Sequence, residues 1–214
     1  MWAKLNDAGD TIEEIISSPK SMTIDGIKHP RQMFQWTTAE LKAVGIVPIT
    51  TSGTSLDERF YIEKDEAFAI AGDKNSVVKT IGEKAGDKKL ADEDAVDKDG
   101  NKLKDDDGNQ MIVYGLKTQA KDRITNNANA RLQGFNWLIQ RKVTADTAIP
   151  SAVITYMAAV RTAHASICTA IDNASDIDAF KVLHTTEYNE DGSVKTVAKV
   201  DDWPDDSGVK GNRR

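Results

Sequence analysis

The stretch from Gly115 to Phe180 constrains the fold most, because its apolar residues recur at helical spacing. Ile124, Ala128 and Leu132 lie four residues apart, which is the spacing of one face of a helix. A second stripe follows Pro150, and it consists of Val153, Met157, Val160, His164, Ile167, Ile171 and Ala174. Because only the short linker VTADTAI separates the stripes, we predict two antiparallel helices that pack as neighbours.

Residues 1–72 have the pattern of a small β-rich module with one short helix. Short runs of strand-forming residues occur at 12–16, 22–27, 46–50, 59–62 and 67–71. Asp25-Gly26 predicts a tight turn within the second run. Thr37 and Glu40 have the spacing of a capping box, and Gly45 is suited to end the helix that they begin.

The composition changes at residue 73. Residues 73–110 are rich in Asp, Lys and Gly, and DKDGN at 97–101 is nearly repeated as DDDGN at 105–109. We predict a polar arm or exposed hairpin that becomes ordered on contact with a partner. Residues 111–183 hold the helical hairpin and a third short helix opened by Ser175 with Asp178. Residues 184–214 are expected to form a hairpin and a loose C-terminal tail, which gives an α+β fold class.

Charge and composition exclude several classes of function. The 214 residues carry a net charge of −6, and non-specific binding to nucleic acid requires a basic surface instead. No apolar run approaches the roughly 20 residues that span a bilayer, and the first residues lack the pattern of a secretory signal. The single cysteine, Cys168, permits no intrachain disulfide. We expect it to be a buried filler of the second helix, in a chain made in a reducing cytoplasm.

The sequence predicts no catalytic, cofactor or metal site. His29, His164 and His184 lie far apart without the spacing of metal ligands, and we expect His164 to be a hydrogen-bonded boundary residue. Counted from Asp97 or from Asp105, glycine falls at position 4, whereas a calcium loop requires it at position 6. Nucleophile-elbow, phosphate-loop and dinucleotide-binding motifs are also missing. We therefore expect a protein that is not an enzyme.

Aromatic and arginine residues supply candidates for an interface. Trp137 and Arg141 share one face if the helix continues through them, so the guanidinium can stack on the indole. This pair either fastens the corner of the hairpin or forms an exposed corner that binds a partner. Phe34 and Trp36 are either core aromatics of the first module or interface anchors. Trp203, followed by a proline, is expected to fasten part of the tail to a surface.

Two segments resemble parts of small proteins from bacteriophage tails. Trp137 and Arg141 follow the first helix, Pro150 opens the second, and Arg161 lies midway along it. This run resembles the C-terminal helical hairpin of proteins of the tail-fibre-assembly type and related virion components. The front segment resembles the opening module of such proteins, and the matching residues are Pro30, Phe34, Trp36, Glu40, Leu41, Gly45 and Ile46. The aspartate-rich middle and the residues after Leu183 have no counterpart in this pattern.

The resemblance implies a structural component of a tailed phage particle that docks on tail or tail-fibre proteins. It implies multiple copies in a symmetric assembly, residence in the virion tail after synthesis in the host cytoplasm, and no nucleic-acid partner or membrane insertion. The interface candidates are then Phe34, Trp36, Trp137, Arg141, Arg161 and Trp203. An assembly chaperone that binds a fibre transiently is the alternative. A tip protein that binds or hydrolyses host carbohydrate is the third hypothesis.

Overall fold

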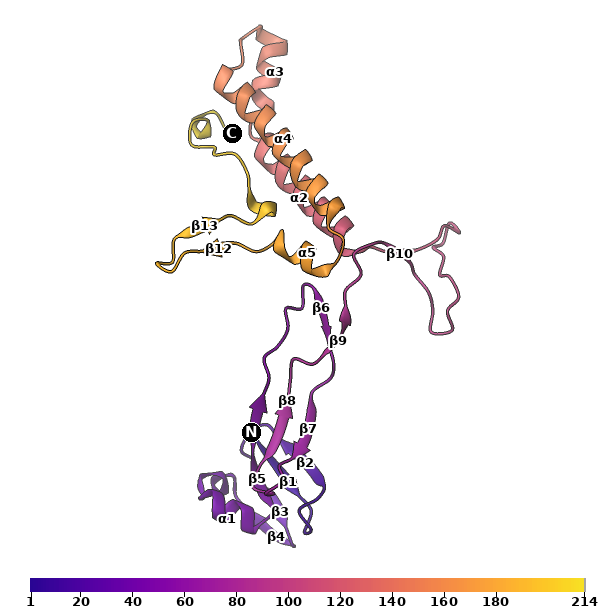
Figure 1. Cartoon of the computed structure of the whole chain (residues 1–214), viewed down its shortest axis with the longest axis vertical. Helices are drawn as coiled ribbons and strands as arrows, with labels where there is room; N and C mark the ends of the chain where they lie inside the picture. The colour runs from indigo at the N-terminus through magenta and orange to yellow at the C-terminus, as the bar shows by residue number, and fades with distance from the viewer. Residues whose placement is uncertain (214) are drawn as a thin grey trace. The chain divides into compact units, whose positions relative to one another are not determined.

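The computed structural model describes residues 1–213 and divides the chain into two compact units. The first unit is Met1–Asp87, and the second begins at Lys88. Strands predominate in the first unit and helices in the second, as Figure 1 shows, so the predicted α+β class is confirmed. Among the described residues, none of the helices combines the length and the apolar character that a bilayer-spanning segment needs.

A five-stranded sheet forms the centre of the first unit, in the order β2-β1-β5-β8-β7. Its strands are β1 (Trp2–Leu5), β2 (Ile12–Ile16), β5 (Ile46–Ser52), β7 (Ala67–Ile70) and β8 (Val77–Thr80). Strands β5 and β8 are parallel, whereas the other neighbouring pairs are antiparallel. Strands β1 and β8 were not among the predicted runs.

Both faces of this sheet carry apolar side chains, because successive residues of a strand point to opposite sides. Ile46 joins a cluster with Leu41 and Phe34, whereas its neighbour Val47 packs with Val77 on the other face. The elements that contribute to the first cluster are β3 (Met22–Ile24), the 3-10 helix η1 (Arg31–Gln35) and α1 (Thr38–Ala43). The short helix therefore stabilises one side of a sheet that is apolar on both sides.

Local signals in this unit are confirmed in detail. Asp25 and Gly26 both have positive φ and connect β3 to β4 (Ile27–His29), so the predicted run at 22–27 is a hairpin. The Thr37 side chain accepts a hydrogen bond from the Glu40 amide, and the Glu40 carboxylate accepts one from the Thr37 amide. Gly45 follows α1 with a φ of 74°, which is a conformation that glycine adopts readily.

The predicted boundary at residue 73 is wrong. Val77 has an exposed fraction of 0% and lies in β8, which pairs with the middle strand of the sheet. Strand β9 (Lys84–Asp87) pairs with β6 (Tyr61–Glu63), so residues 73–87 belong to the first unit. The polar composition around β8 conceals a strand that pairs with both β5 and β7.

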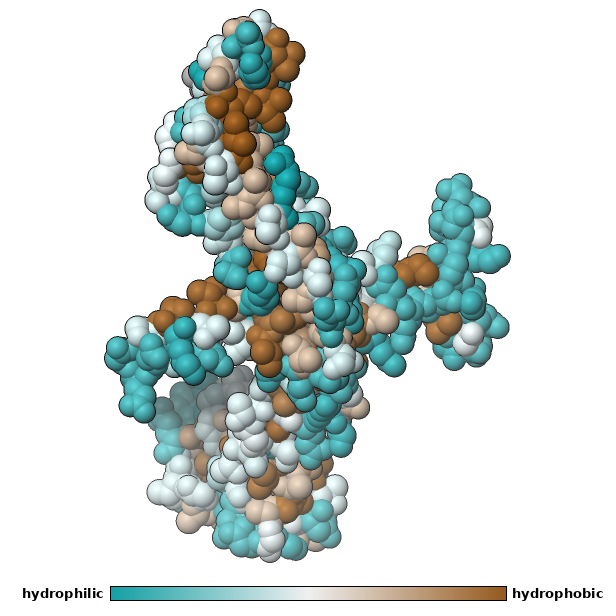
Figure 2. Space-filling model, turned by 45° about the horizontal axis from the view of Figure 1, so that its top comes forward, coloured by the Kyte–Doolittle hydropathy of each residue, from teal (hydrophilic) through white to brown (hydrophobic). Residues whose placement is uncertain are grey.

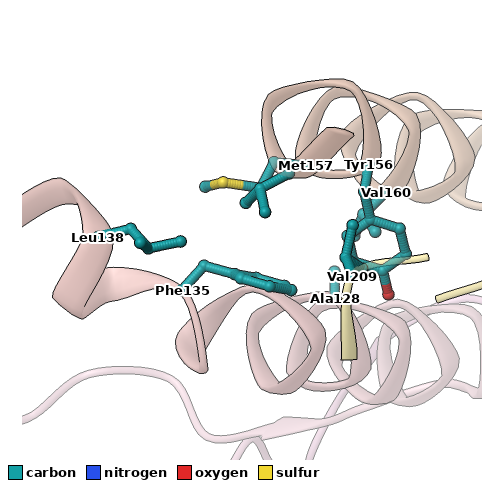
Figure 3. Close-up of a cluster of buried hydrophobic side chains, with 8 residues drawn as sticks. Ala128, Phe135, Leu138, Tyr156, Met157, Val160 and Val209 are labelled. Carbon is teal, nitrogen blue, oxygen red and sulfur yellow. The ribbon is translucent and has the colours of Figure 1, made fainter. Parts of the chain in front are cut away.

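The second unit contains the predicted antiparallel helical pair. Its helices are α2 (Leu116–Gln133), α3 (Asn136–Ala145), α4 (Ser151–Asn173) and α5 (Ile177–Val182). The seam between α2 and α4 buries Ile124, Val160 and Ile167. The first helix is interrupted after Gly134, and there Phe135 packs its ring edge against Tyr156 at a centroid distance of 5.8 Å, as Figure 3 shows. Helix α5 is capped by Asp176, one residue after the predicted Ser175.

The C-terminal segment differs from the loose tail that was predicted. The hairpin around Asp191-Gly192 is confirmed as β12 (Glu187–Tyr188) and β13 (Val194–Thr196), followed by the 3-10 helices η2 (Lys199–Asp201) and η3 (Lys210–Asn212). Val209 is buried in the cluster around Phe135, and the Arg213 guanidinium donates to the Tyr156 hydroxyl at 3.1 Å. Residues 198–213 are therefore docked on the helices. We call them the docked tail.

Candidate interaction surface

A forked arm, residues 93–114, precedes α2. Strands β10 (Glu93–Asp94) and β11 (Ile112–Val113) form its stem, and two short loops diverge from the stem in Figure 1. At the fork, the Ala95 amide donates to Met111, the Met111 amide donates to Leu103, and the Leu103 amide donates to Ala95. This closed triangle of backbone hydrogen bonds fixes the point at which three antiparallel segments meet.

The two loops of the fork are built in the same way. Each begins at an aspartate, Asp97 or Asp105, whose carboxylate accepts hydrogen bonds from the two asparagine nitrogens four residues later. The hydrogen bond from the Asn101 side chain is the main cause of the lowered pKa of Asp97. The hydrogen bond from the Asn109 backbone amide is the main cause of the lowered pKa of Asp105. The near-repeat in the sequence is thus a structural repeat, and its leading carboxylates hold their own turns.

Apolar side chains of the forked arm are exposed. Val113 and Tyr114 have exposed fractions of 60% and 59%. The other exposed large apolar residues of the arm are Val96, Leu103, Met111 and Ile112. Isolated two-stranded ribbons are marginal in water, and clustered apolar surface marks sites of interaction. The arm therefore has the character of a surface that a partner covers.

The base of the forked arm is fixed to the start of α2. The Asp92 carboxylate accepts hydrogen bonds from the Gly115 amide at 2.8 Å and from the Thr118 hydroxyl at 3.0 Å. The carbonyls of residues 89–90 accept the next two amides of the helix. A Cβ atom at Gly115 would lie 2.3 Å from the Ala91 carbonyl oxygen, so only glycine fits. A carboxylate at a helix N-terminus is also favoured by the helix dipole.

A second exposed apolar surface lies on α3 and at the start of α4. We call it the tip patch, and it consists of Ile139, Val143 and Ile154. Ile139 and Val143 are four residues apart on α3 and so share a face, and Val143 is 80% exposed. Figure 2 shows apolar side chains gathered at this end of the helices. Leu138, which precedes Ile139 on α3, is buried instead.

Trp137 and Arg141 come together as predicted. The guanidinium carbon of Arg141 lies 4.9 Å from the centre of the Trp137 ring, and the indole nitrogen donates to the Asn212 carbonyl at 2.9 Å. The Trp203 ring packs on the same cluster and carries the Arg131 guanidinium at 5.0 Å. These tryptophans fasten the docked tail to the helices, which agrees with the expectation for Trp203.

The other interface candidates are scattered. Phe34 is only 8% exposed and packs on Trp2 at 4.8 Å, so it is a core residue and not a surface anchor. Trp36 is exposed and meets the His29 ring edge-on at 5.6 Å. Arg161 is exposed on α4, with one guanidinium nitrogen 3.5 Å from the Met157 carbonyl oxygen. Phe34 and Trp36 belong to the first unit and the remaining candidates to the second.

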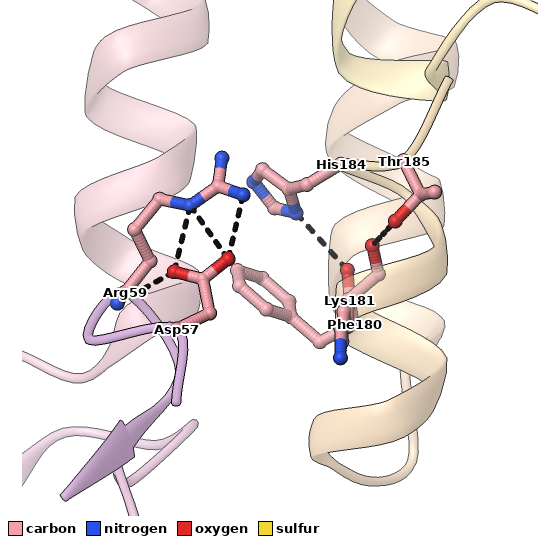
Figure 4. A network of polar contacts seen from close by, with 6 residues as sticks. All are labelled: Asp57, Arg59, Phe180, Lys181, His184 and Thr185. Atoms are coloured by element: carbon pink, nitrogen blue, oxygen red, sulfur yellow. Dashed lines mark hydrogen bonds and ion pairs between the residues drawn. The ribbon is translucent and has the colours of Figure 1, made fainter. Parts of the chain in front are cut away.

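The histidines and the cysteine take part in local contacts. His164 Nε2 lies 3.0 Å from the Thr125 hydroxyl, as expected for a boundary residue, and His184 Nδ1 lies 3.0 Å from the Phe180 carbonyl oxygen (Figure 4). Cys168 is half-buried, and burial raises the pKa of its thiol, which disfavours the reactive thiolate. Within residues 1–213, His, Cys, Asp and Glu form no group of three or more that could hold a metal ion.

One pocket of the first unit carries charges of both signs. Its volume is about 400 Å³, and its charged lining residues are Lys4, Asp7, Asp25, Lys42, Asp73 and Lys74. The Lys4 ammonium donates to the Leu5 carbonyl at 2.8 Å, and the Lys74 ammonium donates to the Ala8 carbonyl at 2.9 Å. These lysines thus stabilise neighbouring loops, and the mixed lining favours no single class of ligand.

Sequence reasoning missed the exposed apolar residues of both surfaces and the role of Arg213. The repeat of DKDGN was visible, and extending it to AVDKDGNK and LKDDDGNQ would have shown that Ala95, Leu103 and Met111 occupy equivalent positions. No pattern near Arg213 in the sequence predicts its role, because its contacts with Tyr156 and Asp206 depend on the docking of the tail.

Comparison of the chain with family models, with curated proteins and with solved structures finds no match.

Proposed function

We propose that this chain is a structural component of a tailed phage particle that acts by docking on proteins of the tail or its fibres. The observation that carries the proposal is the exposed apolar forked arm, which projects from a base hydrogen-bonded to α2. The base of the arm is held to α2 by hydrogen bonds, whereas the two-stranded ribbon beyond it is marginal in water, so contact with a partner protein would stabilise the arm and cover its apolar side chains. The resemblance of the helical hairpin and of the front segment to phage tail proteins supplies the biological setting.

The proposed partners are other tail or tail-fibre proteins, with several copies of this chain in a symmetric assembly. Its place is the virion tail, after synthesis in the host cytoplasm. The docking surfaces are the forked arm and the tip patch, because Trp137 and Trp203, two of the predicted anchors, fasten the chain's own tail.

Mass spectrometry of washed particles, from cultures that produce this chain, tests the proposal. A structural component should be present at a fixed ratio to the major tail protein. An assembly chaperone would be present during assembly and absent from washed particles, and that result would overturn the proposal. A tip protein of the third kind would instead bind or release sugars from host polysaccharide.

A further inference from the structure

The docked tail is held to the helices at few points. Its buried residues are Ala198, Val200 and Val209, and of these only Val209 joins the cluster around Phe135 (Figure 3). The ribbon of β12 and β13, which leads from α5 into the tail, is exposed along both strands, and isolated ribbons of this size are marginal in water. A small number of contacts therefore decides whether the tail stays on the helices.

Asp206 organises the end of the docked tail. Its side chain is only 18% exposed, and its carboxylate pairs with the Lys210 ammonium at 3.3 Å and with the Arg213 guanidinium at 2.9 Å. The Arg213 guanidinium lies 5.4 and 5.8 Å from the ring centres of Phe135 and Tyr156, and it donates to the Tyr156 hydroxyl. One carboxylate of the tail thus holds the cation that connects the tail to the helices.

Arg213 occupies a confined seat that depends on the charge of Asp206. A Cβ atom at Gly134 would lie 3.2 Å from the Arg213 Cγ atom, so the end of α2 leaves little space beside this side chain. The Nε atom of Arg213 is buried and has no hydrogen-bond partner among the described residues. Because a largely buried cation without a counter-charge is unfavourable, neutralising Asp206 should drive Arg213 out of its seat.

The seat of Arg213 is connected to Trp137, which the sequence marks as an interface candidate. The Trp137 indole nitrogen donates to the carbonyl of Asn212, the residue that precedes Arg213. The other side of the pair is Arg141, whose guanidinium stacks on the Trp137 ring. Departure of Arg213 would therefore also remove the acceptor that holds Trp137 to the tail.

We propose that the docked tail is a strap that opens as one unit, with Asp206 as its latch. The closed strap covers the cluster around Phe135 and engages Trp137, whereas the open strap makes Trp137 and Arg141 accessible. Opening follows from contacts within this chain. Its consequence, that docking on tail or tail-fibre proteins is regulated by the strap, rests on the proposed function.

Hydrogen exchange of the full chain tests whether the tail opens as a unit. The hydrogen-bonded amides of the tail and the indole N–H of Trp137 should exchange at one common rate, at least about 100-fold faster than the amides around Val160 in α4. The indole N–H of Trp36, an exposed residue of the first unit, serves as the unprotected reference. Exchange of the tail only at the rate of α4 would show that it does not open separately and would overturn the inference.

Two neighbouring aspartates test the latch. Asp206→Asn keeps the shape of the side chain and removes its charge, so exchange of the tail and of the Trp137 indole should become at least about tenfold faster, with α4 unchanged. Asp205→Asn is the matched control, because the Asp205 carboxylate accepts hydrogen bonds from Ser207 within the tail. It should stay within about twofold of the unaltered chain. Equal effects of the two changes, or no effect of Asp206→Asn, would overturn the role of Asp206.

Competition for particles tests the regulation. When the Asp206→Asn chain and the unaltered chain are expressed together at equal levels, the variant should be enriched in washed particles, because its binding-competent form is more populated. Equal incorporation would contradict the regulation of docking. Absence of both chains from particles would contradict the proposed function and leave the strap itself, which hydrogen exchange decides, unaffected.

Discussion

The forked arm and the docked tail have similar composition and opposite arrangements. Both are rich in aspartate and glycine, and both consist mainly of turns and very short elements. In the docked tail, Ala198, Val200 and Val209 are buried, whereas in the arm the large apolar side chains remain exposed. Polar composition therefore does not by itself indicate disorder. What distinguishes the two segments is whether their few apolar residues find a surface within the same chain.

The largest effect is expected when the docked tail can no longer bury Val209 against the helices. Val209→Asp places a charge in the cluster around Phe135, and we expect the unfolding free energy to fall by roughly 2–4 kcal/mol. Val113→Asp is the matched change in the arm and should stay within about 0.5 kcal/mol of the unaltered chain. Chemical denaturation of both variants gives the comparison, and equal losses would refute it.

A smaller effect is expected at the base of the arm. Gly115→Ala forces a Cβ atom against the Ala91 carbonyl oxygen, which should cost about 1–3 kcal/mol locally. Hydrogen exchange should become faster over residues 88–118 and remain unchanged in the docked tail. Gly192→Ala is not a suitable control, because the φ of Gly192 is positive. Gly208→Ala serves better, since its Cβ would meet no atom within 4 Å.

Loss of the Arg213 contacts that hold the end of the docked tail should have a more modest effect. Arg213→Ala removes the hydrogen bond to Tyr156 and the ion pair with Asp206, and we expect a loss of about 1–2 kcal/mol. Limited proteolysis should then cut the tail as readily as the forked arm, whereas in the unaltered chain the arm is cut first. First cleavage of the unaltered chain within the tail would contradict the docked arrangement.

The smallest effect concerns the paired turns of the arm at low pH. The pKa values of Asp97 and Asp105 are lowered in the folded chain. The stability that these two carboxylates give to their turns is therefore present above the unfolded pKa of about 3.9, and it is lost as the pH falls through the folded pKa values. Carboxyl titration by NMR should give midpoints below about 3.9 for both residues. Asp105→Ala should open the second turn and leave the first intact, and simultaneous opening of both would show that they are coupled.

Sequence reasoning succeeded where structure is set by nearby residues. The stripes of α2 and α4, the capping box at Thr37 and the turn at Asp25-Gly26 all follow from spacing of a few residues. It failed at β8, because Val77 is buried by pairing with a strand far away in the chain. The interface candidates named from the sequence were mainly aromatic. The exposed surfaces are formed largely by aliphatic side chains that resemble core residues in a sequence.

The triangle of hydrogen bonds at Ala95, Leu103 and Met111 limits how this part of the chain can change in length. Two sides of the triangle each span one eight-residue unit, AVDKDGNK and LKDDDGNQ, and the stem closes the third side. Insertion of a third eight-residue unit would add a fourth residue equivalent to Ala95, Leu103 and Met111. These three residues already bond to one another in a closed set, so a fourth could join only if one of their hydrogen bonds opened. Insertion of whole units would therefore change the geometry of the junction as well as the length of the arm. Changes within a loop would leave the three hydrogen-bonded residues undisturbed.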